Sequence, residues 1–137
     1  MKSNTLTYNN EIPDPHQLCN LFAFVGWTGT FSDENKIRET LTARPMFVVC
    51  VYDKDKLVGF GKTLEDGIRC LIYDIVVNPS YKRRGIGKTI MSELVSYAKA
   101  KRYSYVRLFA WRDNPATVPF YESMGFKKME NAMQLDI

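Results

Sequence analysis

The sequence predicts one mixed α/β domain over residues 1–137, with the element order βααβββαβαββ. The spacing of apolar residues changes from a helical to an alternating period near residue 46, and the helical period returns after residue 85. The composition is 45% hydrophobic and 25% charged over 137 residues. These values are typical of a globular chain with one hydrophobic core.

The first third of the chain is expected to hold one strand and two helices. Residues 5–9 alternate and are rich in threonine and tyrosine, which indicates a short strand. Asp14 and Pro15 can cap and begin a helix that ends near Gly26. A second cap at Asp33 predicts a short amphipathic helix that stops before the proline at position 45.

Three β-rich runs separated by turn residues follow, at 46–53, 56–65 and 68–77, and they predict an antiparallel meander. The next segment has isoleucine, leucine and alanine at i, i+4 spacing, which predicts a helix from Gly85 to about Arg102.

The last third is expected to return to the sheet. Residues 105–111 predict a buried strand that runs parallel to the third strand of the meander after a right-handed crossover. A short helix from Pro115 to Gly125 comes next. Two closing strands, at 126–130 and 132–137, complete the predicted order.

Composition also narrows the class of function. No apolar run approaches the roughly 20 residues that a membrane span needs, and the first residues lack the apolar core of a signal peptide. We therefore expect a cytoplasmic protein without a membrane partner. The three cysteines are far apart and odd in number, and there is one histidine, so neither a disulfide framework nor a metal site is expected.

Positive charge is concentrated in one part of the chain. Between Lys82 and Arg107 there are eight basic residues and one acid, a local charge of +7 in a chain whose net charge is +4. Such a concentration favours an anionic partner, although solvated surface lysines are the commoner explanation of any single charge. The segment carries no recognised nucleic-acid-binding motif, so nucleic acid is a minor alternative.

The centre of this basic segment is a glycine-containing turn between a strand and a helix. A helix N-terminus presents unpaired amides and a partial positive charge, which suits phosphate. Glycines at 85 and 87 let a pyrophosphate approach the main chain. The turn lacks the Walker spacing and the third glycine of the dinucleotide-binding fingerprint. A tight turn with solvated basic flanks is the alternative interpretation.

The stretch IYDIVVNPSYKRRGIGKTIM resembles the acetyl-CoA-binding signature of the GCN5-related N-acetyltransferase (GNAT) family, Q/R-x-x-G-x-G/A, with Lys82 in the Q/R place. Downstream, NPATVPFYESMGF is similar to the family segment N-x-x-A-x-x-x-Y-x-x-x-G-F, with Thr117 in place of the usual alanine and an unexpected Pro119. The two motifs stand at the family's separation, and the resemblance covers nearly the whole chain.

The resemblance implies that acetyl-CoA is bound where the strand before the signature splays from the strand after the helix, and that coenzyme A is the product. The pantetheine arm would pair with the main chain of that strand, and the basic turn would hold the pyrophosphate. The residues it implies for this role are Ile75, Val76, Val77, Lys82, Arg83, Arg84, Gly85, Ile86, Gly87, Lys88, Asn114 and Tyr121.

The resemblance also implies the chemistry: direct attack of a primary amine of a small molecule or peptide on the thioester, in a ternary complex. Tyr121 would be the general acid, since a phenol with a pKa of about 10 is protonated at neutral pH. Packing in an aromatic cluster is its alternative role. Asp74 and Glu65 are candidate bases, and Asp74 could instead pair with a nearby lysine or arginine.

The acceptor is less defined. In this family the first two helices and their connection usually determine acceptor specificity, so Trp27 and Phe31 could line an aromatic pocket, or they could be core residues at a helix end. Acidic residues at 33, 34, 65 and 66 would favour a cationic acceptor. Many relatives form homodimers, which is the expectation for this chain too. A non-catalytic acyl-CoA sensor of the same fold is the alternative function.

Overall fold

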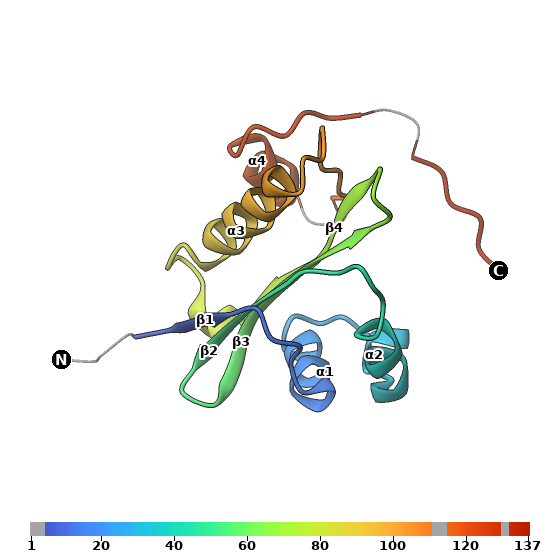
Figure 1. Cartoon of the computed structure of the whole chain (residues 1–137). Helices are drawn as coiled ribbons and strands as arrows, with labels where there is room; N and C mark the ends of the chain where they lie inside the picture. The colour runs from blue at the N-terminus through green and yellow to red at the C-terminus, as the bar shows by residue number, and fades with distance from the viewer. Residues whose placement is uncertain (1–4, 111–114, 130–131) are drawn as a thin grey trace.

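The computed structural model describes residues 5–110, 115–129 and 132–137. It contains a four-stranded antiparallel sheet in the order β1-β2-β3-β4, with helices on both faces (Figure 1). The elements are β1 (Thr7–Asn9), α1 (Pro15–Phe24), α2 (Glu34–Thr40), β2 (Val48–Asp53), β3 (Lys56–Glu65), β4 (Cys70–Val77), α3 (Ile86–Ala100) and α4 (Thr117–Glu122). The prediction of a mixed α/β class is confirmed.

The first two helices begin at the predicted caps. Asp14 accepts a hydrogen bond from the amide of His16, with Pro15 as the first residue of α1. Asp33 accepts from the amides of Asn35 and Lys36 at the start of α2. These side chains satisfy amides that have no intrahelical acceptor, which is why the helices start where they do.

Two apolar clusters lie on the two faces of the sheet. One joins α1 and α2 to the sheet and includes Phe22 and Phe60. The other joins α3 to the sheet and includes Ile90 and Leu94. A Cβ at Gly61 would lie 2.6 Å from Cγ2 of Ile90, so a glycine at this strand position permits the close approach of α3.

β4 contains an irregularity that determines the position of the site. Its pairing with β3 shifts between Phe60 and Lys62, and Asp74 has a left-handed φ of +58°. Ile75 packs with the α3 cluster, whereas the Asp74 carboxylate lies beside Lys62, whose ammonium reaches α2. Two successive residues at the bulge therefore serve opposite faces of the sheet.

The three strands predicted last are not formed in the part of the chain that the structure describes. Residues 105–110 meet β4 in the predicted parallel direction, but only through a bridge between Leu71 and Arg107 and its hydrogen bonds. The expected strands at 126–130 and 132–137 are not strands in the described residues, and Met133 is 93% exposed. A strand needs a partner ladder, and the segment at 105–110 pairs with the sheet at too few residues to extend it.

Among the described residues, no helix is both long and apolar enough to span a membrane.

Candidate active site

A cavity of about 570 Å³ lies between the end of β4, the turn before α3, the first turn of α3 and α4. Nine of the twelve predicted cofactor-binding residues line it: Ile75, Val77, Lys82, Arg83, Gly85, Ile86, Gly87, Lys88 and Tyr121. The structure thus brings Tyr121 to the basic turn and the first turn of α3, which precede it by more than thirty positions in the sequence.

One wall of the cavity is suited to an anion. Gly85, with φ of +73°, is the N-cap of α3 and contributes no capping side chain, so the amides of the first turn are not satisfied by a cap. Arg83 is also left-handed, with φ of +66°, so the chain turns sharply into the helix. With the cationic side chains of Lys82 and Lys88 on the same wall, amides and charges converge on the cavity.

The other wall is the edge of β4. Among the described residues, its pairing with the segment at 105–110 ends at Ile72, whose amide donates to the carbonyl of Arg107 over 2.8 Å. The strand then continues past the bulge to Ile75 and Val77, which line the cavity. The splay between two strands that the resemblance implies stays a prediction, because the segment at 105–110 is not a strand.

Tyr121 is half-buried near the end of α4. Its ring packs edge-on against Phe120 and Phe126, at centroid distances of 5.2 and 5.8 Å, and it also lines the cavity. Burial raises the pKa of its hydroxyl, which keeps the phenol protonated at neutral pH. The Tyr121 side chain therefore packs in an aromatic cluster and also faces the cavity.

The Asp74 carboxylate lies on the opposite face of the sheet from this cavity. Its Oδ2 is 3.5 Å from Nζ of Lys62, and the Asp74 side chain is 15% exposed. Burial raises the pKa of Asp74, and the Lys62 ammonium opposes that shift.

Glu65 lies on the α3 face, away from Asp74. Its carboxylate accepts hydrogen bonds from the hydroxyls of Thr63, Tyr97 and Tyr103, at 2.6, 3.0 and 2.9 Å. The side chain is buried and its oxygens are engaged by three donors, so it joins β3 to the end of α3 rather than facing the cavity.

Comparison with known proteins identifies the family. Residues 12–126 match the family model described as Acetyltransferase (GNAT) family. The chain belongs to the GNAT family. A curated relative from Pyropia yezoensis, the uncharacterized N-acetyltransferase ycf52, is 30% identical over 124 residues, which cover 88% of this chain and 67% of that protein. The resemblance inferred from the two motifs is confirmed, and the chain is an N-acetyltransferase.

Solved structures of acetyltransferases share this fold. A probable acetyltransferase of unknown function from meticillin-resistant Staphylococcus aureus superposes with a TM-score of 0.83 at 26% identity, covering 97% of this chain and 100% of that one. The structure of AAC(6')-Iy, bound to the bisubstrate analogue CoA-S-monomethyl-acetylneamine, shares the fold with a TM-score of 0.77 at 12% identity, covering 98% and 99%. The GNAT family uses acetyl-CoA and an acceptor.

Three residues predicted to bind the cofactor do not line the cavity. Val76 is 3% exposed and belongs to the α1 side of the sheet, because side chains alternate along β4. The guanidinium of Arg84 lies over the ring of Tyr81, 5.1 Å from its centroid. Asn114 lies outside the described residues.

Four lining residues are not among the predicted cofactor-binding residues: Tyr81, Ala116, Thr117 and Phe120. Tyr81 donates a hydrogen bond to the Asp53 carboxylate, which ties the turn before α3 to the hairpin between β2 and β3. An aromatic residue directly before the basic turn was the available signal.

The expected acceptor residues have local partners. Trp27 and Phe31 pack on Phe22 at centroid distances of 5.3 and 5.1 Å and on each other at 5.1 Å, which favours the core interpretation for both. The acids proposed to attract a cation are engaged as well. Asp33 caps α2, Glu34 lies 3.1 Å from the ring of His16, and Asp66 pairs with Arg69 at 3.0 Å.

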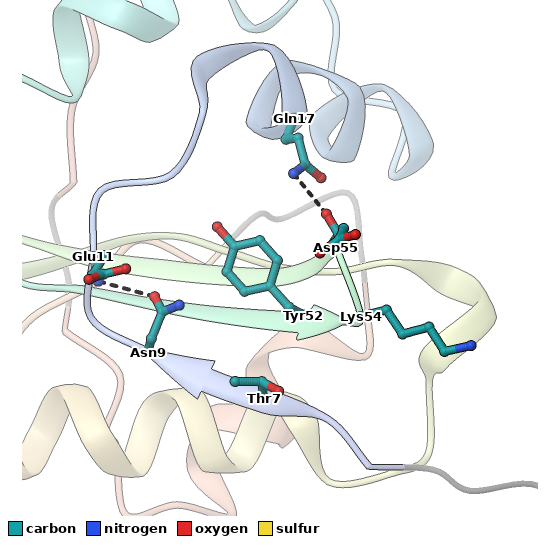
Figure 2. A pocket seen from close by; sticks show the side chains of 7 residues that line it. All are labelled: Thr7, Asn9, Glu11, Gln17, Tyr52, Lys54 and Asp55. Atoms are coloured by element: carbon teal, nitrogen blue, oxygen red, sulfur yellow. Dashed lines mark hydrogen bonds between the residues drawn. The ribbon is translucent and has the colours of Figure 1, made fainter.

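A second hollow, of about 410 Å³, lies at the edge formed by β1, α1 and the hairpin between β2 and β3 (Figure 2). Gln17 bridges part of it by donating to the carbonyl of Asp55 over 2.9 Å and accepting from the amide of Leu57 over 2.8 Å. None of the predicted site residues lies there. The cavity beside α3 is therefore the better candidate for the active site.

Proposed function

We propose that this GNAT protein transfers the acetyl group of acetyl-CoA to a primary amine of a small molecule or peptide by direct attack in a ternary complex. The observation that carries the proposal is one cavity lined by the basic turn and first turn of α3, the end of β4 and Tyr121. The S. aureus and AAC(6')-Iy folds support it, the latter through its CoA-containing analogue.

In this proposal the pyrophosphate of acetyl-CoA binds to the first-turn amides of α3, beside Lys82, Arg83 and Lys88. The pantetheine arm runs along Ile75 and Val77 and pairs with the part of the β4 edge that has no ladder partner among the described residues, much as an added strand would. The thioester then lies near the bulge of β4 and near Tyr121.

The amine attacks the thioester carbonyl from the α1 and α2 side, where the Asp74 carboxylate lies. Asp74 takes the proton that the amine loses, directly or through a water. When the carbon–sulfur bond breaks, the hydroxyl of Tyr121 protonates the leaving thiolate. Among the described residues this hydroxyl has no hydrogen-bond partner, so it is free to donate to the sulfur. Glu65 is not assigned a step, because its oxygens are engaged on the other face.

The test is release of free thiol from acetyl-CoA in the presence of amines, polyamines, aminoglycosides and peptide N-termini, compared between the wild type and Tyr121→Phe. We expect Tyr121→Phe to lower kcat by about 10²- to 10⁴-fold, the range for a lost general acid, with coenzyme A affinity retained. Tyr8→Phe, on β1 and outside the cavity, is the control for loss of a phenol hydroxyl.

Full activity of Tyr121→Phe would refute the acid assignment. Saturable binding of coenzyme A without thiol release for any acceptor would favour an acyl-CoA sensor over the enzyme. A cytoplasmic location and a homodimer stay predictions, to be checked by fractionation and by light scattering.

A further inference from the structure

The bulge of β4 holds a buried ion pair that the cofactor cavity does not explain. Lys62 is 5% exposed, although lysine is rarely buried unless it is paired. Its neighbour on the same face of β3 is Phe60, a core residue that is fully buried. Burying the charge of a lysine on this face of β3 carries a desolvation penalty that an apolar residue would avoid.

Lys62 is held from two sides. Its Nζ donates to the hydroxyl of Thr40, the last residue of α2, over 2.6 Å, and lies 3.5 Å from Oδ2 of Asp74. The ammonium therefore links α2, β3 and the bulge of β4. The side chain of Lys62 is 6% exposed, and that of Asp74 is 15% exposed. The carboxylate is thus the more accessible member of the pair.

Asp74 also has an unusual backbone. Its φ of +58° is uncommon for a residue with a side chain, although aspartate tolerates it better than most. Strained residues of this kind cluster at functional sites. Ile75, the next residue, lines the cofactor cavity on the other face. The pair therefore lies directly across the sheet from the cavity wall.

We propose that Lys62 is a positioning residue that keeps Asp74 ionised and fixed at the bulge, and so sets the lower pH limit of acetyl transfer. This inference rests on the proposed function, in which Asp74 accepts the proton of the amine. A protonated Asp74 cannot act as that base, and a desolvated carboxylate without a cation beside it is protonated at higher pH.

The charges around Asp74 support a specific role for Lys62. Among the described residues, Lys62 is the one charged group that shifts the protonation of Asp74. Thr40 on α2 is uncharged. The buried residues of α1, which packs on β4, are apolar: Leu18, Leu21 and Phe22. The buried residues of α3, on the far face, are apolar as well.

The test compares Lys62→Met with Lys36→Met, a matched variant that removes an exposed lysine of α2 and changes the net charge equally. Two quantities are measured: the pH profile of kcat/KM, and the titration of the Asp74 carboxyl carbon by nuclear magnetic resonance, assigned by its absence in Asp74→Asn. We expect Lys62→Met to move the acid limb and the Asp74 titration upward by about one to three pH units. Lys36→Met should move neither.

An unchanged acid limb together with an unchanged Asp74 titration in a folded Lys62→Met protein would overturn the inference. If Lys62→Met does not fold, Thr40→Val takes its place, since it removes one partner of the ammonium and keeps both charges. It should shift both quantities in the same direction by less, and no shift would overturn the inference.

Two further results separate this inference from the proposed function. If the Asp74 titration moves while the acid limb does not, Asp74 is not the base, which refutes both its role and the pH-setting role of Lys62. If the wild type shows no acetyl transfer, the proposed function fails, whereas the titration still reports whether Lys62 keeps Asp74 ionised.

Discussion

Gly85→Ala separates the backbone role of this glycine from its role in binding. Gly85 has φ of +73°, and a Cβ built there has no atom within 4 Å, so the substitution causes strain without a clash. An alanine held in the left-handed conformation lowers the free energy of unfolding by about 1 to 2 kcal/mol. Alanine also reduces the conformational entropy of the unfolded chain, which offsets part of that loss. We therefore expect a loss of about 1 kcal/mol, or about 3 to 5 °C in Tm for a chain of this size.

The effect on binding should be larger. The new methyl group enters the cavity edge where the proposed pyrophosphate approaches the first-turn amides of α3. Losing one charge-assisted hydrogen bond costs about 1.5 to 3 kcal/mol, which corresponds to about a ten- to hundredfold weaker Kd for coenzyme A. Calorimetric titration with coenzyme A measures the Kd, and thermal unfolding followed by circular dichroism measures the stability.

Gly26→Ala is the matched control. Gly26 follows the end of α1, has φ of +82°, and also has no atom within 4 Å of a built Cβ. It should lose similar stability and keep wild-type affinity for coenzyme A. A wild-type Kd for coenzyme A in Gly85→Ala, or an equal loss of affinity in Gly26→Ala, would contradict this prediction.

Two further predictions concern tyrosine hydroxyls. Tyr81→Phe removes the hydrogen bond to Asp53 but keeps the ring on the cavity wall, so we expect KM for acetyl-CoA to rise by about two- to tenfold with kcat unchanged. Asp53→Asn should also raise KM. An unchanged KM in steady-state kinetics would show that the hydrogen bond between Tyr81 and Asp53 does not hold the turn before α3 in place for binding. Burial, followed by the hydrogen bond to Glu65, raises the pKa of Tyr97 from 10.0 to about 12. Because the pKa of Tyr97 is higher in the folded state than in the unfolded state, the protonated phenol stabilises the fold fully below about pH 10. This stabilisation is lost as the pH rises toward 12. The difference in free energy of unfolding between the wild type and Tyr97→Phe, measured in urea, should therefore shrink between about pH 9 and pH 11.5, and a constant difference would contradict the linkage.

Local sequence signals were sufficient to predict most of the secondary structure. The caps at Asp14 and Asp33, the meander and the helix after Gly85 are found where the sequence predicts them, within about two residues. Each of these features depends on neighbouring residues: a capping side chain, an alternating run or a glycine. The last predicted strands are absent from the described residues, because a strand exists only with a partner ladder and residues 105–110 offer β4 a single bridge.

The sequence by itself determined the family and most of the residues that line the candidate cavity. Its two motifs name nine residues of the cavity, since turn glycines, basic side chains and a tyrosine at fixed spacing can be recognised without coordinates.

Only the tertiary structure decided which candidate base faces which side of the sheet. Asp74 and Glu65 were equivalent in the sequence, yet the bulge places Asp74 beside Lys62, whereas Glu65 is held by three hydroxyls under α3. The physical reason is that the partners of a buried charge come from distant segments. Lys62 meets Asp74 and Thr40, and Tyr97 and Tyr103 meet Glu65, only after the helices have packed on the sheet.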